Sequence, residues 1–439
     1  MTRLAQNTGW LYGRHLVGAI ADFIAVRIAL GALGVEGYGV YSAVVGVVFF
    51  ALTFQAVFAT TAERFLSRAV GLRTDVSNSF SAVLFLSLVL SIMTVLAGET
   101  IGRWFVLHRL SIPSAYASSV ILVMRTGVAV VVLRILRIPF AAQIFAHERM
   151  RLLAQVSLVG AGCVLLSAGT AWFLRPDALV TYAVAVAVGE GVVTLTCAVW
   201  SVRAQLPGCR ISRPQRERLL EMFSFFSWNT LSAFGNLLKY RFVNVLLNVF
   251  AGVALNATWS LSLYAGCVLS ALTTGFQGAF QPVIYKAWAA GEAEDAAQIV
   301  GGATVGAGLL AAIPGVPVFV LAPQVLTAIL STDLPPQAVA FVRCIVLNVV
   351  FDAVSGPLTA GVLASGRVAV YQVAAFGCAI AGTVGAFLVL SAGLPAWMSL
   401  GSVVVSNGAA TAYRYFCVWR LLGRPPCLTI GALRRSMGR

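Results

Sequence analysis

Basic side chains within apolar segments are the residues of this sequence with the clearest potential for chemistry. Charged residues make up 10% of the 439 residues, yet eight lysines and arginines fall inside segments that are otherwise apolar enough to cross a membrane. A basic side chain at the centre of a lipid-facing helix costs roughly 2.5–3.5 kcal/mol. Such side chains should face a counter-charge, an interface or a water-filled interior. The eight are Arg27, Arg125, Arg134, Arg137, Lys239, Arg241, Arg343 and Arg414.

Acids within the same segments are too few to neutralise these bases. We place three there: Asp22, Glu190 and Asp352. The surplus of positive charge predicts that the protein binds an anion. Carboxylates inside a membrane often relay protons or bind ions, so the same three acids are candidates for coupling to H⁺ or Na⁺. The alternative role for each is a static salt bridge to one of the arginines.

The segment 117–141 holds an arginine pair suited to phosphate. Arg134 and Arg137 are three residues apart and lie on one helix face, with Arg125 nearer the outer end. Planar guanidinium groups bind phosphate oxygens in two-pronged fashion, which favours pyrophosphate as the anion. The alternative is that an arginine extends from a helix end to the interface, and this better explains Arg343 and Arg414.

A polar stripe in the segment 223–250 indicates which face lines a cavity. Four polar residues follow one another at intervals of four and so stack on one helix face, flanked by two bases. The alternative is a hydrogen-bonded seam between two helices. The cavity is favoured over the seam, because the flanking charges need contact with water or an anion. The predicted substrate-binding residues are Arg27, Arg125, Arg134, Arg137, Asn236, Lys239, Tyr240, Arg241, Asn244 and Asn248.

The elements that carry these residues are predicted to be transmembrane helices. Hydrophobic residues make up 59% of the chain and the mean hydropathy is +0.91, too apolar for a soluble domain. We therefore expect an all-α polytopic membrane protein, with twelve segments long enough to cross about 30 Å of hydrocarbon. They are about 12–34, 38–62, 79–98, 117–141, 153–174, 179–202, 223–250, 254–282, 297–322, 337–362, 369–391 and 396–420, and the bases at their very ends, Arg14 and Arg420, are counted with the cytoplasmic flanks.

The charges between these segments predict the orientation in the membrane. If the N-terminus is cytoplasmic, the inner segments hold 19 basic residues and the outer ones hold three, Arg103, Arg109 and Arg175. This bias places both termini in the cytoplasm. The net charge of +15 is thus explained by topology and anionic lipid, and we expect no nucleic-acid partner.

An internal repeat predicts two lobes of six helices. The frame Gly34 to Ser42 recurs in the second half of the chain as Gly252 to Ser260. Six helices are an even number, so the two copies have the same orientation, and a cavity between such lobes is the usual substrate site of a transporter. The expected divisions are an N-terminal lobe 1–205, a cytoplasmic loop 206–222, a C-terminal lobe 223–421 and a basic cytoplasmic tail 422–439.

Enzyme signatures were sought and none was recognised. The three histidines, at 15, 108 and 147, are scattered, and the eight cysteines form neither a disulfide framework nor a CxxC metal site. We therefore predict a protein that is not an enzyme, with no catalytic residues, no metal and no cofactor.

Short motifs spread along the chain resemble one family. Those of the first half are Asn7-Thr8, Tyr12-x-Arg14, Arg27-x-x-Leu30, Leu33-Gly34, Tyr38-Gly39-x-Tyr41, Arg64-Phe65-Leu66, Glu99 to Gly102, Leu110 to Pro113, Ile138-Pro139-Phe140 and Ala146 to Met150. Those of the second half are Phe225 to Asn229, Gly252 to Ala257, Phe276 to Pro282, Ala364 to Gly366 and Tyr371-Gln372. As an ordered set they resemble the polysaccharide-transporter, O-antigen flippase-like branch of the multidrug/oligosaccharidyl-lipid/polysaccharide (MOP) exporter superfamily.

The resemblance implies a function and partners. It implies a flippase that moves undecaprenyl-pyrophosphate-linked oligosaccharide across the bacterial inner membrane by alternating access between two lobes. The expected partners are this lipid-linked substrate, membrane lipid, a coupling ion and the polysaccharide assembly machinery. Asp22 does not match a family position. The alternatives are a drug or metabolite antiporter of the same superfamily, and a polysaccharide polymerase, which usually has a longer external loop.

Overall fold

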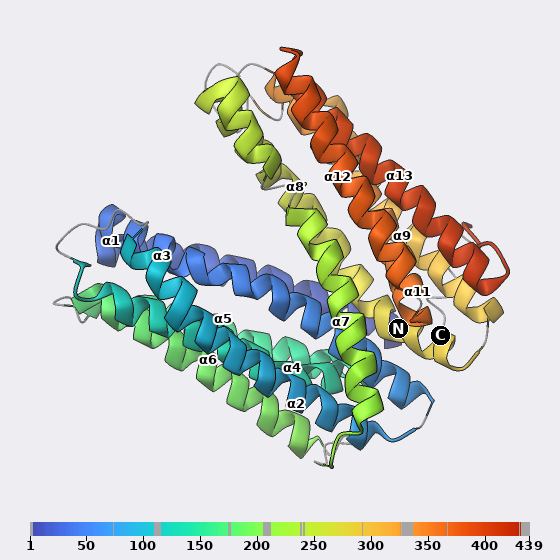
Figure 1. The fold of residues 1–439 in the computed structure, drawn as a ribbon, viewed down its shortest axis with the longest axis horizontal. Helices are drawn as coiled ribbons and strands as arrows, with labels where there is room; N and C mark the ends of the chain where they lie inside the picture. Colours follow the sequence, from blue (N-terminus) through green and yellow to red (C-terminus); the bar gives the residue numbers. More distant parts are fainter. Residues whose placement is uncertain are drawn as a thin grey trace. The chain divides into compact units, whose positions relative to one another are not determined.

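The chain forms two compact helical units. The computed structural model describes residues 3–72, 74–108, 116–173, 177–204, 212–237, 239, 242–291, 293–324, 326, 337–366, 368–429 and 431. Within these residues the secondary structure is helical and contains no strand. One unit comprises Gly9–Phe226, and the other comprises Met1–Thr8 with Ser227–Arg439 (Figure 1). We refer to them as the N-terminal and C-terminal units.

The N-terminal unit begins with a helix that a glycine interrupts. The helix α1 (Arg3–Gly71) has a non-helical residue at Gly34, with φ 71° and ψ 169°, a conformation that favours a residue without a Cβ atom. The break separates the first predicted span from the second. The remaining helices of the unit are α2 (Val76–Ala97), the π-helix η1 (Gly98–Gly102), α3 (Arg103–His108), α4 (Val120–Ala146), α5 (Met150–Phe173) and α6 (Ala178–Arg203).

The C-terminal unit is organised around α11. Its helices are the second half of α7 (Arg216–Leu237), α8 (Val243–Ala289), α9 (Ala293–Val320), α11 (Ala338–Ser365), α12 (Ala369–Ser391) and α13 (Trp397–Leu422). The helix α11 packs against α8, α9 and α13, and α12 packs beside α13 (Figure 1). Its buried face includes Phe341, which shares an apolar core with Trp259 of α8. Polar residues on α11 are therefore held in a fixed position.

Equivalent helices of the two units start or end the same number of residues apart. This spacing equals the one between the two copies of the sequence motif, which begin at Gly34 and Gly252. The starts of α4 and α11, at Val120 and Ala338, differ by this offset. The ends of α5 and α12 differ by the same offset, and so do the ends of α1 and α8. The repeat therefore extends from short motifs to whole helices, as expected for two copies of one six-helix unit.

Several helices extend beyond the predicted spans. The second predicted segment ends at 62, but α1 continues to Gly71, and the third covers 79–98, whereas α2, η1 and α3 together run from Val76 to His108. Helical hydrogen bonding continues past the point where apolar composition ends, so hydropathy marks the hydrocarbon rather than the helix. Two further acids, Glu63 and Glu99, consequently lie on the helices.

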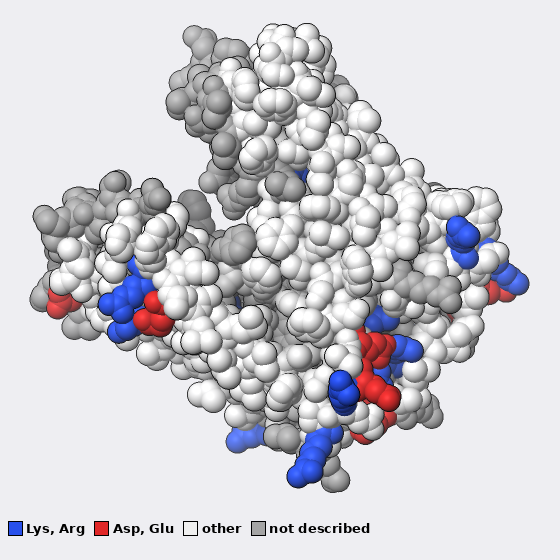
Figure 2. Space-filling model, viewed as in Figure 1, with Lys and Arg blue, Asp and Glu red and all other residues white. Residues whose placement is uncertain are grey.

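By length and apolar composition, seven helices in the described part of the chain can cross a membrane. The number is eight when the bent pair Val40–Gly46 and Ala51–Gly71 counts as one span. Large apolar side chains project outward, including Phe23, Phe173 and Val405, and the face shown in Figure 2 carries its charges in small groups separated by wide uncharged areas. Lipid is the solvent that such a surface fits.

The segment after α13 is packed tightly against α9. A side chain at Gly301 of α9 would overlap the backbone of Cys427, so the close approach requires glycine. Pro426 beside it is buried. Arg424 Nη1 lies 2.9 Å from Glu294 Oε2 at the start of α9. The end of the described chain is thus fixed to the C-terminal unit.

Candidate functional site

In the N-terminal unit, the arginine pair of α4 shares one carboxylate from α6. Arg134 Nε lies 3.0 Å from Glu190 Oε2, and Arg137 Nη1 lies 2.6 Å from Glu190 Oε1. One turn further along α6, Thr194 Oγ1 donates a hydrogen bond to the Leu133 carbonyl at 3.1 Å and holds the two helices together. The three charged groups carry one net positive charge. Both guanidinium groups are therefore already engaged by a protein carboxylate.

Asp22 adds a second acid near this pair. It is exposed on α1 and interacts electrostatically with Arg134. Two tyrosines of the same unit, Tyr41 and Tyr182, pack edge to face with ring centroids 4.8 Å apart and also lie within electrostatic reach of the cluster. With Asp22 and Glu190 facing Arg134 and Arg137, the described charges of this region balance.

The other predicted bases fall into different surroundings. Arg125 forms a two-pronged ion pair with Glu99 of η1, at 2.7 and 3.0 Å, and is exposed. Arg27 is exposed on α1. Arg343 Nε donates to the Phe319 carbonyl at 3.1 Å in the last turn of α9, where helical carbonyls lack partners. The structure thus brings Arg134 and Arg137 together and leaves Arg125 with a partner of its own.

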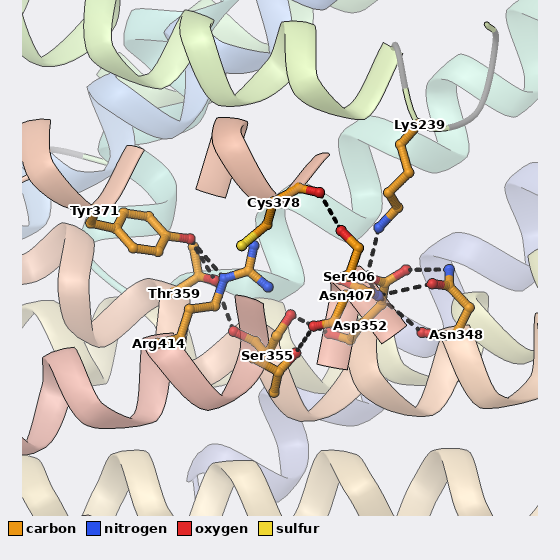
Figure 3. A network of polar contacts seen from close by, with 11 residues as sticks. Lys239, Asn348, Asp352, Ser355, Thr359, Tyr371, Cys378, Ser406, Asn407 and Arg414 are labelled. Carbon is orange, nitrogen blue, oxygen red and sulfur yellow. Dashed lines mark hydrogen bonds and ion pairs between the residues drawn. The ribbon is translucent and has the colours of Figure 1, made fainter. Parts of the chain in front are cut away.

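In the C-terminal unit, Asp352 of α11 is the centre of a polar network (Figure 3). Lys239 Nζ lies 3.9 Å from Asp352 Oδ1, and the lysine side chain is 6% exposed. Asn407 of α13 donates to Asp352 Oδ1 at 2.8 Å and to Asn348 Oδ1 at 3.0 Å, while Asn348 donates to Asp352 Oδ2 at 3.2 Å. These contacts fix the carboxylate between two amides and an ammonium group.

A second cation, Arg414 of α13, is oriented by a tyrosine. Arg414 Nε donates to the Tyr371 hydroxyl at 2.8 Å, and its guanidinium carbon lies 5.8 Å from the centroid of the tyrosine ring. Thr359 of α11 lies 3.5 Å from the same hydroxyl. Figure 3 shows one terminal nitrogen of the guanidinium group beside Cys378. Within the described residues, Arg414 forms no ion pair.

A partly open hollow lies between these two cations. The hollow is small, and its walls come from α12 and α13, with Lys239 as the residue outside these helices. Small side chains leave the space, and Ser406 donates to the Cys378 carbonyl across it. The lining residues are Lys239, Ala375, Cys378, Ala379, Ser406, Asn407, Ala410 and Arg414. All of them belong to the C-terminal unit.

A neighbouring helix supplies the hydrogen bond that a proline next to the network cannot donate. Pro357 has no N–H for the Ala353 carbonyl, which lies beside Asp352 in the sequence. Gln277 Nε2 of α8 donates to that carbonyl at 3.0 Å instead. A side chain at Gly356 would overlap Gln277, so the glycine makes room for this contact. The backbone of α11 at Pro357 is therefore held by a hydrogen bond from α8.

Some predicted site residues lie outside the described part. These are Tyr240 and Arg241, together with the side chains of Asn236 and Asn248. Asn244 is described and half-buried, and its Oδ1 atom has no hydrogen-bond partner in the described residues.

Asn407, Tyr371 and the contact of Arg414 with Tyr371 were not predicted from the sequence. A signal was available, because Asn407, Ala410 and Arg414 lie on one face of the last predicted span. The contact of that face with Asp352 depends on helix packing, which no short motif encodes.

Comparisons with solved structures show the fold of this chain. A MATE transporter in the bent conformation has a TM-score of 0.84 at 15% identity, covering 100% of this chain and 97% of its own. A MOP superfamily transporter from Pyrococcus furiosus, described by a reverse polarity of its binding pocket, has a TM-score of 0.80 at 14% identity over 96% of each chain. An outward-facing multidrug resistance MATE family transporter of the MOP superfamily has a TM-score of 0.75 at 16% identity over 96% of each chain.

These likenesses show that the chain has the twelve-helix, two-lobe fold of MATE transporters. No protein-family model matches the sequence, and no curated protein matches it.

Proposed function

We propose that this protein exports an undecaprenyl-pyrophosphate-linked oligosaccharide across the bacterial inner membrane by alternating access. The observation that carries the proposal is the surplus of positive charge in the C-terminal unit, where Lys239 and Arg414 border one hollow beside a single carboxylate, Asp352. Isolated charge at membrane depth is costly, and an anionic substrate would neutralise it. The fold supplies two lobes that could open alternately to either side.

Transport against a gradient needs an ion whose binding differs between the two open states. Asp22, Glu190 and Asp352 are the proposed coupling acids, with H⁺ or Na⁺ as the ion. Glu190 and Asp352 form ion pairs with basic neighbours in this structure, whereas Asp22 is exposed and forms none among the described residues. Asp22 is therefore our first candidate for binding the coupling ion. The export role includes no catalytic step, and the glycan assembly machinery is the proposed supplier of substrate.

A second candidate function is drug or metabolite antiport. The likeness to a multidrug resistance MATE family transporter supports it. A cationic drug would be repelled by Lys239 and Arg414, so an antiporter with this interior should carry neutral or anionic compounds.

Replacing Lys239 and Arg414, the two bases of the hollow, together by alanine distinguishes these functions. We expect loss of surface glycan with the protein still present in the membrane, because the substrate's phosphates lose their partners. Glycan display and membrane abundance are measured in cells that lack the native exporter. The exposed Arg424→Ala variant is the control and should export normally. Full glycan export by this double variant would contradict the proposal, and loss of drug resistance without loss of glycan would favour antiport.

A further inference from the structure

The strongest unassigned feature is the hollow that Lys239 and Arg414 share. It lies entirely within the C-terminal unit and does not require residues of the other unit. The sequence pointed to Arg134 and Arg137 as the phosphate-binding pair, but both are engaged by Glu190. Arg414 has no carboxylate partner among the described residues, and its Nε is held by Tyr371. We propose that this hollow is a phosphoryl-binding site, with Lys239 and Arg414 as its two cationic contacts.

The orientation of Arg414 leaves its terminal nitrogens available. The Nε–H is used by the Tyr371 hydroxyl, which fixes the plane of the guanidinium group. One Nη group lies beside Cys378, and Lys239 extends toward the network from the opposite side (Figure 3). A planar fork and a flexible ammonium group together can contact several oxygens of one phosphoryl group.

The charges around the hollow favour an anion over a cation. Its described surroundings contain two bases and one acid, and the two bases repel each other electrostatically. Asp352 is restrained by amide donors from Asn348 and Asn407, so its carboxylate stays on the Lys239 side. A bound oxyanion relieves the repulsion at the Arg414 side, where no carboxylate of the described residues reaches.

Small side chains make the hollow a site for a head group rather than for a bulky glycan. Ala375 and Ala379 of α12 and Ala410 of α13 form its walls. The inference rests on the proposed function for the identity of the transported molecule, whose diphosphate end would bind here. The phosphoryl group itself could come from free phosphate, a phospholipid head group or the carrier lipid, because the same contacts recognise all three.

Binding of inorganic pyrophosphate to the full-length protein in phosphatidylcholine nanodiscs tests this site. We expect saturable binding by titration calorimetry and a loss of about tenfold in affinity for Arg414→Gln, as for one charge-assisted contact. Tyr371→Phe keeps the ring but removes the hydroxyl, so it should lower the affinity less than Arg414→Gln. Asp352→Asn should raise the affinity, because a competing negative charge is removed. A merely structural Asp352 would not produce that gain.

The matched control is Arg424→Gln, which removes the same charge from the same unit at an exposed position. An equal loss of pyrophosphate affinity in this control variant would contradict the proposed site. Unchanged affinity in a folded Arg414→Gln variant would contradict it too, and so would displacement of pyrophosphate by chloride at equal concentration. Displacement by undecaprenyl diphosphate but not by phosphatidylglycerol assigns the site to the carrier lipid, and displacement by both assigns it to phosphorylated lipids in general. Binding without glycan export would refute the proposed function and leave the site intact.

Discussion

Each unit carries a charged side chain shortly before a proline on the equivalent helix, but the two charges have opposite signs. Arg134 precedes Pro139 on α4, and Asp352 precedes Pro357 on α11, at positions that the repeat makes equivalent. The partner of Arg134 comes from α6, as Glu190, and a partner of Asp352 comes from the equivalent helix α13, as Asn407. The same scaffold position is thus basic in one unit and acidic in the other.

The first span of each unit follows the same reversal. Asp22 interacts electrostatically with Arg134 in the N-terminal unit, whereas Lys239, at nearly the equivalent position of the repeat, lies beside Asp352 in the C-terminal unit. The repeat has kept the position of an electrostatic interaction and exchanged the signs of its two ends. The two units differ in the additional base nearby, since Arg137 is paired with Glu190, whereas Arg414 forms no ion pair among the described residues.

The largest expected effect comes from breaking the pair in the C-terminal unit. Lys239→Asp places two carboxylates together in a site where the lysine is 6% exposed, and should cost roughly 3–5 kcal/mol of stability. Adding Asp352→Lys reproduces the polarity of the N-terminal unit and should restore most of the thermal unfolding midpoint. Thermal melts of the purified single and double variants provide the measurement. A double variant as unstable as the single one would show that the two units are not equivalent here.

A smaller effect is expected where the two units differ in how they replace the backbone hydrogen bond that a proline cannot donate. The residue of the N-terminal unit equivalent to Gln277 is Ala59, which cannot donate a side-chain hydrogen bond. Gln277→Ala should therefore cost about 1–3 kcal/mol by leaving the Ala353 carbonyl without its donor. Pro357→Ala returns an N–H to that carbonyl.

Combining Gln277→Ala with Pro357→Ala should cost less than the sum of the two single changes. Chemical or thermal unfolding of the four proteins in this cycle gives the coupling free energy. Strictly additive losses would mean that Gln277 stabilises α11 through packing alone.

The smallest expected effect concerns the residue that ends α4 or α11. Glu148 has φ 58° and its counterpart Gly366 has φ 76°, both in the left-handed region. A side chain there costs roughly 1–2 kcal/mol. Glu148→Gly should raise stability slightly and Gly366→Ala should lower it, as read from unfolding midpoints. A stabilised Gly366→Ala variant would show that the two turns are under different constraints.

Much of this architecture can be predicted from the sequence, because apolar length and repeated motifs reflect local physics. The offset between Gly34 and Gly252 anticipates the offset between whole helices. The helix ends at Gly71 and His108 could not be predicted from hydropathy, since polar residues continue a helix into the interface. The number of acids on the helices was underestimated for this reason.

The pairing of charges was less predictable than their presence. Arg134, Glu190 and Asp352 are visible in the sequence, but their partners depend on which helices pack together. Arg125 and Arg134 lie on the same helix, yet Arg125 forms an ion pair with Glu99 and Arg134 forms one with Glu190. Arg414 is near a helix end, which favoured an interfacial role until the packing of α12 placed Tyr371 against it.

The close approach of Gly301 and Cys427 has a consequence for synthesis. The surface of α9 around Gly301 is made long before the segment that covers it, so at about 5–20 residues per second it stays uncovered for roughly 6–25 s. The C-terminal unit can therefore finish packing only after the segment around Cys427 has left the ribosome. A reporter fused in place of residues after Gly423 would prevent this last step, whereas one attached beyond Thr429 would let it proceed.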